Sequence, residues 1–373
     1  MPGRPLSLRG PDGELIVRGA EGAPELHILR DAFFRRLGAA GKIGFGEAYM
    51  AGDWAAVGDL AAVLEPFAAN LERLVPPPLQ RLRRFFEPRP PTSERNTVEG
   101  AARNVRLHYD LSNELFELFL DETMTYSCAI FEPGDTLAEA QRRKLRAMAD
   151  LAGVTSGHRV LEIGSGWGGM AVHLATTYGC SVTTITISPE QAAFARRRVT
   201  AAGVHDLVDV QLCDYRRVAG RYDRIVSIEM FEAVGERYWR QFFAACDRLL
   251  APGGRLAMQT ITMPHRRYRA SRRSYTWIHK YIFPGGLIPS IEAVEQAASR
   301  GSALRVSDRV ELGRHYATTL RAWRLRFTDR REQVLEQGFG EEFIRMWELY
   351  LAHCEAGFAT AQLGDVQLAL ERG

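Results

Sequence analysis

The sequence predicts an α/β fold in which helices cover both faces of a parallel sheet. From about residue 136, short apolar runs alternate with helical patterns, and a glycine-rich turn follows the first apolar run. Alternation of this kind is typical of strand–helix–strand units, whose parallel strands pair within one sheet. The region before it lacks the alternation. We therefore expect a smaller, mostly helical N-terminal domain in front of a doubly wound sheet.

The strands and helices of the sheet domain can be assigned in chain order. The five predicted strands are residues 159–163, 181–187, 207–212, 224–228 and 255–261. Helices are expected at residues 170–178, after Ser188, and at 237–250. Ser188 suits a helix N-cap and Pro189 suits the first turn. Beyond Pro264 the pattern is helical and aromatic, which indicates helical insertions that cap the sheet.

The N-terminal domain is predicted to cover residues 1–75. A weak strand pattern spans residues 14–17, and helical spacing of apolar residues predicts helices at 26–37 and 60–71. The glycines at positions 41, 44, 46 and 52 predict a loop between these helices. Residues 76–96 are rich in proline and arginine, which predicts a linker, and residues 97–373 then form the second domain.

Composition excludes several classes of protein. The chain has 373 residues, of which 46% are hydrophobic and 25% are charged, as in an ordinary globular protein. A net charge of +3 gives no support for a nucleic-acid partner. The five cysteines have neither disulfide nor zinc-ligand spacing, so we expect a reducing compartment and no metal site. An apolar signal or membrane-spanning stretch is also absent from the sequence.

The glycine-rich turn at residues 164–169 predicts a nucleotide-type site. Glycines at the end of a strand let the backbone turn sharply and approach a ligand closely, although a plain tight connection is an equal alternative. The next strand ends in Thr186-Ile187-Ser188, without the carboxylate that dinucleotide folds use for ribose. Together with Glu162, this points to S-adenosylmethionine. Asp214 could then bind the adenine amine and Tyr215 could stack on its ring, or Asp214 could merely cap a turn.

Ordered motifs run along nearly the full chain. They are Gly46-Glu47-Ala48-Tyr49-Met50, His108-Tyr109-Asp110, Tyr126-Ser127-Cys128, the glycine turn, Thr186-Ile187-Ser188 with Gln191, Met230-Phe231-Glu232, Lys280-Tyr281-Ile282-Phe283-Pro284 and Tyr316. With these motifs the sequence resembles the cyclopropane fatty acid synthase family of S-adenosylmethionine-dependent lipid methyltransferases. The resemblance implies a class I methyltransferase fold, which is Rossmann-like. It also implies cofactor contacts from Tyr126, Ser127, Gly164, Gly166, Trp167, Gly168, Thr186, Ile187, Gln191, Asp214 and Tyr215.

The resemblance implies a reaction as well. In the family, methyl transfer to an alkene leaves a carbocation, and a bicarbonate ion held in the active site is thought to remove a proton. Of the family residues that hold this ion, the cysteine, the glutamate and the tyrosine correspond to Cys128, Glu232 and Tyr316 here. Ile261 corresponds to the position whose backbone amide contacts the ion. The family's histidine is replaced by Gln259, and Glu229 stands where the family usually has a small residue.

These two departures lead to a mechanistic hypothesis. Loss of the histidine weakens an anion site and an added carboxylate repels an anion, so bicarbonate is doubtful here. We expect Glu229 to be the general base, oriented by Gln259, Cys128 and Tyr316. Alternatively, Glu229 merely ends its strand facing water. An altered base favours a mid-chain methylene product over a cyclopropane ring. Two other functions remain as alternatives, namely a methyltransferase that acts on a small molecule and a lipid-binding subunit without activity.

A run of cations predicts contact with a membrane. Residues 265–273 contain five arginines and lead into Tyr275 and Trp277, a combination that suits docking on anionic lipid, although a charge run is often only a solvated face. Family members acting on intact phospholipids are similar in carrying the N-terminal extension. We therefore expect an unsaturated phospholipid acyl chain as substrate and a cytoplasmic, peripherally membrane-associated enzyme. The sequence does not determine whether the protein forms a homo-oligomer or whether a reductase acts on its product.

Overall fold

The computed structural model describes residues 6–70, 91, 94, 96–98, 100–101, 103–104 and 112–373. The chain forms two compact units. Unit 1 comprises residues 1–90, 273–282 and 316–363, and unit 2 comprises residues 91–272, 283–315 and 364–373. Helical segments from the C-terminal half thus group with the N-terminal region, whereas the sequence predicted consecutive domains. Most of the predicted linker and the His108-Tyr109-Asp110 motif lie outside the described residues.

Unit 2 is built on a seven-stranded sheet with the order β10-β11-β9-β8-β5-β6-β7. The five predicted strands are present and parallel. They are β5 (Arg159–Ile163), β6 (Ser181–Thr186), β7 (Val208–Leu212), β8 (Tyr222–Ile228) and β9 (Leu250–Thr262).

Two further strands that the sequence did not predict, β10 (Leu304–Glu311) and β11 (Gly364–Arg372), join the sheet antiparallel. Neither strand gave a clear signal. Strand β10 is largely exposed, and β11 places the buried polar residues Asp365 and Gln367 among apolar ones. Both patterns depart from the alternation of apolar and polar residues that marks a half-buried strand.

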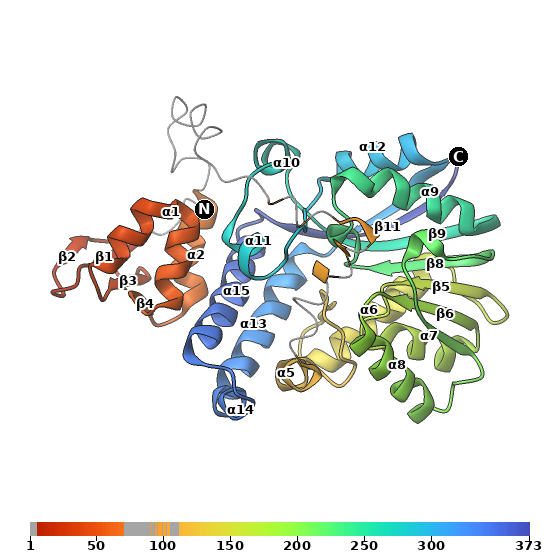
Figure 1. Cartoon of the computed structure of the whole chain (residues 1–373), viewed down its shortest axis with the longest axis horizontal. Helices are drawn as coiled ribbons and strands as arrows, with labels where there is room; N and C mark the ends of the chain where they lie inside the picture. Colours follow the sequence, from red (N-terminus) through yellow and green to blue (C-terminus); the bar gives the residue numbers. More distant parts are fainter. Residues whose placement is uncertain are drawn as a thin grey trace. The chain divides into compact units, whose positions relative to one another are not determined.

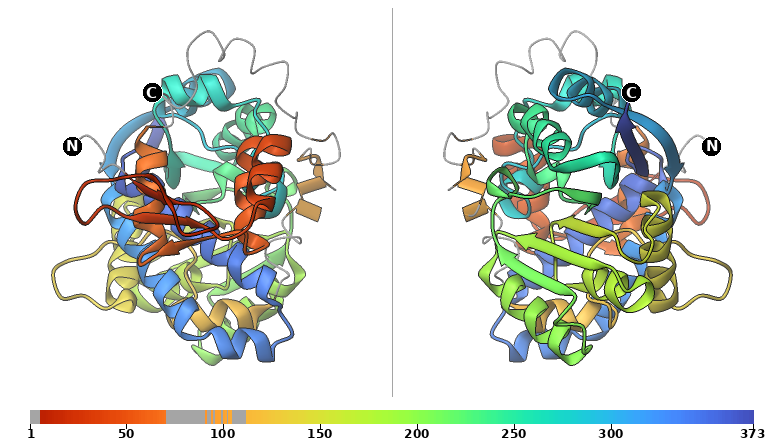
Figure 2. Two further views of the ribbon diagram at one scale, coloured as in Figure 1. Left: turned by 90° about the vertical axis from the view of Figure 1, so that its left-hand side faces the viewer. Right: turned by 90° about the vertical axis from the view of Figure 1, so that its right-hand side faces the viewer.

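Helices cover both faces of this sheet, as the sequence predicted (Figure 1). On one face, α6 (Leu137–Ala152), α7 (Gly169–Tyr178) and α8 (Pro189–Ala201) share an apolar core with the strands. On the other face, α9 (Trp239–Leu249) and α12 (Ile291–Gly301) form a second core. Figure 2 shows these helices around the same strands from two further directions.

Local signals explain where two of these helices begin. Ser188 caps α8 by accepting a hydrogen bond from the Gln191 N–H, and Pro189 occupies the first turn. Thr136 and Glu139 form a reciprocal capping box at the start of α6. Further short elements of unit 2 are α5 (Asn113–Phe119), η2 (Tyr215–Arg217), η3 (Phe231–Ala233), η4 (Glu236–Tyr238) and α10 (His265–Ser271).

Unit 1 combines a small sheet with helices. The sheet has the order β2-β1-β3-β4, formed by β1 (Ser7–Arg9), β2 (Leu15–Val17), β3 (Glu25–Ile28) and β4 (Trp54–Val57). The helices are α1 (Ala32–Met50), α2 (Leu60–Ala69), α11 (Trp277–Tyr281), α13 (Gly313–Asp329), α14 (Arg331–Glu336) and α15 (Glu341–Ala359). Among the described helices, none is both long and apolar enough to cross a membrane.

Two predictions for the N-terminal region were wrong. Leu26 belongs to strand β3, and the predicted glycine loop lies largely inside α1, which kinks at Gly41 where φ is 53° and then continues to Met50. The glycines after the kink serve close packing instead of a turn. A Cβ atom on Gly44 would lie 1.9 Å from the Arg36 carbonyl oxygen, and one on Gly46 would lie 2.4 Å from the Trp277 ring.

Candidate active site

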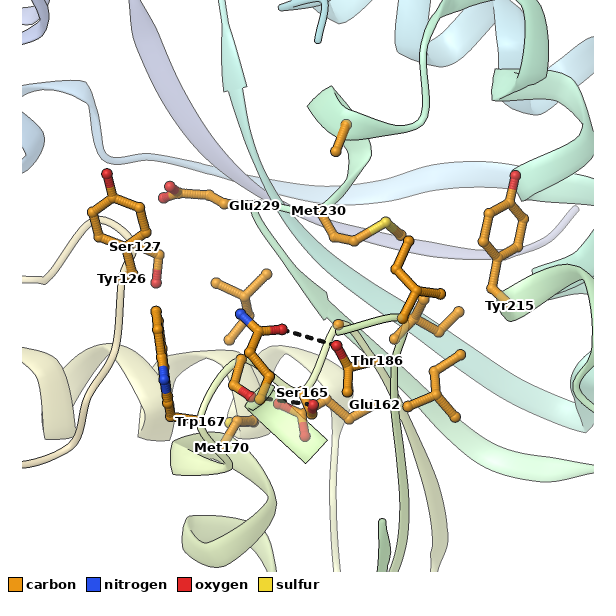
Figure 3. A pocket seen from close by; sticks show the side chains of 18 of the residues that line it. Tyr126, Ser127, Glu162, Ser165, Trp167, Met170, Thr186, Tyr215, Glu229 and Met230 are labelled. Carbon is orange, nitrogen blue, oxygen red and sulfur yellow. Dashed lines mark hydrogen bonds between the residues drawn. The ribbon is translucent and has the colours of Figure 1, made fainter. Parts of the chain in front are cut away.

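A pocket with a cavity volume of about 170 Å³ lies in unit 2 and is lined in part by the ends of β5, β6 and β8 (Figure 3). In an open sheet of this type, ligands bind beyond the carboxyl ends of the strands where the strand order changes direction, here between β5 and β8. The predicted cofactor residues that line it are Tyr126, Ser127, Gly164, Gly166, Trp167, Thr186, Ile187, Gln191, Asp214 and Tyr215. The remaining predicted residue, Gly168, begins α7 behind this lining.

The glycine turn shapes one wall of the pocket. Gly164, Gly166 and Gly168 all have positive φ angles, of 97°, 47° and 85°, which side chains rarely adopt. A Cβ atom on Gly168 would lie 3.1 Å from the Ala195 side chain, so this glycine lets α7 and α8 approach. A Cβ atom on Gly166 would meet nothing within 4 Å. The backbone at Gly166 is therefore open toward the space a ligand would fill.

Polar and aromatic side chains fix two further walls. Thr186 Oγ1 donates to Gln191 Oε1 over 2.8 Å, as the dashed line in Figure 3 marks. This pair holds the Gln191 amide at the end of β6, where no carboxylate is present. Trp167 is 1% exposed, and its Nε1 donates to Asn113 Oδ1 over 2.7 Å. The indole ring is thereby held in one orientation beside the glycine turn.

Asp214 and Tyr215 have structural partners of their own. The Asp214 carboxylate accepts from the Arg216 backbone N–H over 2.9 Å and from Arg216 Nε over 2.7 Å, so it does cap the turn. The Tyr215 ring packs edge-on against Phe242, and its buried hydroxyl has no hydrogen-bond partner among the described residues. Burial raises the pKa of this hydroxyl above its usual range. A buried polar group without a partner is unusual in a folded protein.

Glu162 is a buried carboxyl group in the pocket wall. Thr184 Oγ1 donates to its Oε2 atom over 2.5 Å, and burial raises the pKa of Glu162 to about 8. Because the charged form is disfavoured by burial, the residue carries a proton at neutral pH.

A second group of carboxyl side chains, Glu229, Glu232 and Asp365, adjoins the pocket, and we call it the carboxyl cluster. Glu229 lines the pocket directly after β8. Its Oε1 atom accepts from the Cys128 backbone N–H and from Gln259 Nε2, each over 2.8 Å. In Figure 3 the Glu229 side chain extends toward Tyr126 and Ser127. Cys128 contributes its backbone here, while its buried thiol is directed to the Ala129 carbonyl oxygen.

The backbone of Glu229 is strained. Its φ angle is 47°, in the left-handed region that favours glycine and costs other residues about 1–2 kcal/mol. A small residue would be the natural choice at this position for steric reasons alone. Strained backbone tends to persist where surrounding contacts fix it, and such positions gather at functional sites. Here the two hydrogen bonds to Oε1 and the bond from the Glu229 N–H to the Gln259 carbonyl oxygen hold the conformation.

Glu232 and Asp365 complete the carboxyl cluster. Glu232 Oε1 accepts from Thr260 Oγ1 over 2.8 Å and from the Ile261 N–H, while its buried Oε2 has no partner among the described residues. Burial, followed by the charge of Glu229, raises the pKa of Glu232 to about 8. Gln259 Nε2 donates to Asp365 Oδ2 over 2.9 Å as well as to Glu229. One amide group thus lies between two carboxyl groups.

Sequence reasoning did not single out Asp365 or the nearby buried Lys144. Asp365 lies on β11, which the sequence did not predict, so no local pattern assigned it to the site. Lys144 did leave a signal. On α6 it lies four residues after Ala140 and four before Met148, and all three are buried. A lysine on the buried stripe of an amphipathic helix is rare unless it has a partner.

Two predicted residues belong to unit 1. Tyr316 is buried on α13, where its ring stacks on Phe358 at 4.4 Å. Trp277, predicted to face a membrane, is 6% exposed, and its Nε1 atom contacts Met50 Sδ at 3.4 Å. The prediction for Trp277 was therefore wrong, because α1 covers its ring. Among the described residues, no group of His, Cys, Asp and Glu side chains is arranged to hold a metal ion.

Comparison with known proteins agrees with this architecture. Residues 96–368 match the family model described as mycolic acid cyclopropane synthetase. The chain belongs to this family. It is 48% identical to the tuberculostearic acid methyltransferase UfaA1 of Mycobacterium tuberculosis, over 99% of this chain and 88% of that protein. It is 33% identical to the cyclopropane-fatty-acyl-phospholipid synthase of Escherichia coli K12, over 96% of this chain and 90% of that protein.

A solved structure of the family has the same fold. The mycolic acid cyclopropane synthase CmaA1, in complex with SAH and CTAB, aligns with a TM-score of 0.67 and 32% identity. The alignment covers 72% of this chain and 97% of CmaA1. The class I methyltransferase fold implied by the sequence is thus confirmed.

Proposed function

We propose that this protein transfers the methyl group of S-adenosylmethionine to the double bond of an unsaturated fatty acyl chain in a phospholipid, and that proton loss then leaves a mid-chain methylene branch. The relation to a tuberculostearic acid methyltransferase over nearly the whole chain supports the substrate class. The observation that carries the proposal is the Glu229 carboxylate at the pocket, fixed by two N–H donors.

The pocket residues fit the cofactor. Gly166 leaves open space above a helix N-terminus, where electron-rich groups are favoured. The Gln191 side chain offers a polar contact at the end of β6, where it lines the pocket. Trp167 lines the pocket, and an aromatic ring attracts cations. When bound, S-adenosylmethionine supplies a methyl group on a positively charged sulfur.

Glu229 is suited to accept the substrate's proton. A carboxylate that accepts two N–H donors is stabilised in its ionised form, and it lies directly at the pocket. In the reaction, methyl addition to one alkene carbon leaves a cation on the neighbouring carbon, and a hydride shift moves the cation to the methyl-bearing carbon. One C–H bond of the added methyl group then breaks, its electron pair forms the new double bond, and the proton moves to Glu229. Cys128 and Gln259 orient the carboxylate, and no bicarbonate ion is required. For Tyr316, a role in orienting the base remains part of the proposal.

Closure of a cyclopropane ring is the second candidate product. The 33% identity with a cyclopropane-fatty-acyl-phospholipid synthase favours it, and the methyl-transfer step would be the same. If the added methyl group loses its proton before the hydride shift, the electron pair of that C–H bond closes the ring onto the neighbouring cationic carbon instead. We place the methylene product first because Glu229 fixes the base in the protein itself, at a position the family usually fills with a small residue.

The proposal can be tested with labelled cofactor and oleoyl phospholipid. Glu229→Gln should lower the rate of methyl transfer by at least about 100-fold, the usual size of a lost general base. Glu236→Gln is the matched control, because Glu236 pairs with Arg272 outside the pocket lining. Mass spectrometry should find a methylene acid, using a derivative that reports unsaturation, since a cyclopropane acid has the same mass. Full activity of Glu229→Gln would exclude Glu229 as the base.

The proposal includes docking on an anionic membrane surface. Of the eleven large apolar side chains that are exposed in the described chain, seven lie within residues 15–57: Leu15, Ile16, Val17, Leu29, Phe34, Leu37 and Val57. Such exposed apolar groups favour contact with a membrane or a protein. The arginines of α10 provide a second, charge-based candidate surface.

Vesicle binding distinguishes the two surfaces. Binding to anionic phospholipid vesicles that depends on α10 should fall steeply with salt and with Arg266→Glu/Arg269→Glu. Binding that depends on the N-terminal region should persist in salt and fall with Ile16→Ser/Val17→Ser. No binding by the unaltered chain at low salt would refute membrane docking.

A further inference from the structure

Two buried glutamines are hydrogen-bonded to the groups that donate to Glu229. Gln141 on α6 is 0% exposed, and Gln367 on β11 is 1% exposed. Neither side chain lines the pocket, so both act from outside it. A glutamine is seldom fully buried, and a buried amide normally has hydrogen-bond partners. The partners of these two amides lead back to Glu229.

Gln141 holds the segment that lines the pocket just before Cys128. Its Nε2 atom donates to the Thr125 carbonyl oxygen over 3.2 Å and to the Ser127 carbonyl oxygen over 2.8 Å. The two hydrogens of one NH₂ group thus serve two carbonyls of one short segment. The reverse orientation of the amide would place its oxygen against two carbonyl oxygens, which would repel it. The chemistry of the partners therefore fixes the direction of the Gln141 amide.

The bond to Ser127 determines where the Cys128 N–H points. The Ser127 carbonyl and the Cys128 N–H belong to one peptide unit, which is planar and trans, so the C=O and the N–H point in opposite directions. Because the carbonyl is bonded to α6, the N–H points away from α6. In that direction it donates to Glu229 Oε1 over 2.8 Å. Gln141 thus aims this donor at Glu229 through a single rigid peptide unit.

A second bond from α6 holds the same residue. Lys144 is 0% exposed, and its Nζ atom donates to Ser127 Oγ over 2.6 Å. Gln141 and Lys144 lie three residues apart, a spacing that places both side chains on one face of a helix. Ser127 is therefore fixed by α6 at its carbonyl and at its hydroxyl, and a rotation of the peptide unit would strain both bonds.

Gln367 has the same relation to the other donor. It lies directly opposite Gln259 in the register of β11 and β9, and its Nε2 atom donates to Gln259 Oε1 over 3.1 Å. An amide whose oxygen is held on one side presents its NH₂ group to the other side. On that side, Gln259 Nε2 donates to Glu229 Oε1 over 2.8 Å.

We infer that Gln141 and Gln367 are positioning residues that aim these two donors at Glu229 Oε1, one through a peptide unit and the other through a side-chain amide. The inference rests on the proposed role of Glu229 as base. Neither glutamine takes up the proton. Donors that are fixed in advance stabilise the ionised carboxylate without having to reorient first.

Nuclear magnetic resonance of the Cys128 amide tests the inference without an activity assay. Labelling with ¹⁵N-cysteine marks five residues, and the Cys128 signal is the one that Cys128→Ala removes. In the unaltered protein this signal should move with pH as Glu229 takes up a proton, and Glu229→Gln should abolish this step. Gln141→Met and Gln367→Met should each move the midpoint of the step upward by about half a pH unit or more, because a misaligned donor stabilises the carboxylate less.

Met148→Ala is the matched control for loss of stability. Met148 is buried on the same helix as Gln141 and packs in the apolar core, so its truncation leaves a cavity but removes none of these hydrogen bonds. It should lower the thermal unfolding midpoint and leave the midpoint of the Cys128 step unchanged. In the methyl-transfer assay, Gln141→Met should lower kcat about tenfold with an unchanged KM, and the acid limb should move upward with the Cys128 step.

Two results would overturn the inference. One is a Cys128 signal that does not titrate in the unaltered protein, and the other is a midpoint that stays unchanged in both glutamine variants. If the step moves as expected while Glu229→Gln keeps full methyl transfer, the positioning role stands and the proposed base fails. Gln141→Asn covers the case in which Gln141→Met folds poorly. It keeps the amide but is one methylene shorter, so it should lose the bond to the Ser127 carbonyl and show the same upward shift.

Discussion

The glycine wall of the pocket and the carboxyl cluster beside it are assembled in opposite ways. The glycine wall comes from one continuous turn, residues 164–169, whose shape depends on local backbone conformation. The carboxyl cluster and its partners come from separate segments that hold Cys128, Lys144, Glu229, Gln259 and Asp365. The contrast teaches that the proposed cofactor wall is encoded locally, whereas the proposed base depends on which distant residues the fold brings together.

The largest effect is expected at the glycine wall. Gly166→Val should weaken S-adenosylmethionine binding by about 100-fold or more, because valine is strained at a φ of 47° and its side chain would point into the open space. Gly179→Val is the matched control. It imposes similar strain at a φ of 64° at the other end of α7, with open surroundings outside the pocket lining. Equal binding losses in both variants, measured by calorimetry, would mean that only helix stability was affected.

An intermediate effect is expected when the carboxyl cluster is rebuilt toward the family pattern. Glu229→Gly removes the base and its backbone strain, and Gln259→His adds a possible donor for an anion. The double variant should transfer methyl groups about tenfold faster with added bicarbonate than without it, which is a partial recovery of the about 100-fold that a general base usually contributes. The unaltered enzyme should show no such dependence. Bicarbonate dependence in the unaltered enzyme would show that the cluster still uses an external base.

A smaller effect is expected at Asp214, which lines the pocket after β7. Asp214→Asn should weaken cofactor binding by about tenfold, since an amide cannot hold the Arg216 guanidinium as firmly as a carboxylate does. Asp247→Asn is the control, because Asp247 pairs with Arg372 outside the pocket lining. Unchanged affinity in Asp214→Asn would indicate that its interaction with Arg216 serves only the turn.

The smallest effect concerns stability. The pKa of Glu162 is about 8 in the folded state and about 4.5 in the unfolded chain, so folding retains a proton between these values and stability falls as pH rises through this window. Glu162→Gln should remove this pH-dependent loss of stability. The variant should therefore raise the unfolding midpoint by a few degrees more at pH 8 than at pH 5.

The exposed Glu139 provides a contrast for this measurement. Its pKa is lowered by hydrogen bonds from Thr136, so its contribution is present above pH 4.5 and is lost on acidification. Glu139→Gln should therefore destabilise the protein more at neutral than at acidic pH. A midpoint difference in Glu162→Gln that does not depend on pH would contradict the buried, protonated state of Glu162.

Prediction from the sequence succeeded where the signal was local. The strands β5 to β9, the cap of α8 and the pocket-lining glycines all depend on residues close together in the chain. It failed where distant packing dominates. The glycines at 44 and 46 indicated a loop but serve close helix packing, and Trp277 indicated a surface but lies under α1. Strands β10 and β11 escaped prediction because one is exposed and the other buries polar residues.

The sequence alone therefore determined the family, the α/β order and the glycine turn, because each is written in neighbouring residues and enforced by backbone geometry. It also singled out Glu229 as unusual. Only the tertiary structure brought Gln259 and the Cys128 N–H onto one oxygen of Glu229, and only it placed Lys144 and Asp365 nearby. Hydrogen bonds and charge balance in a buried site depend on distances of a few ångströms between segments far apart in the chain, and the folded chain alone sets those distances.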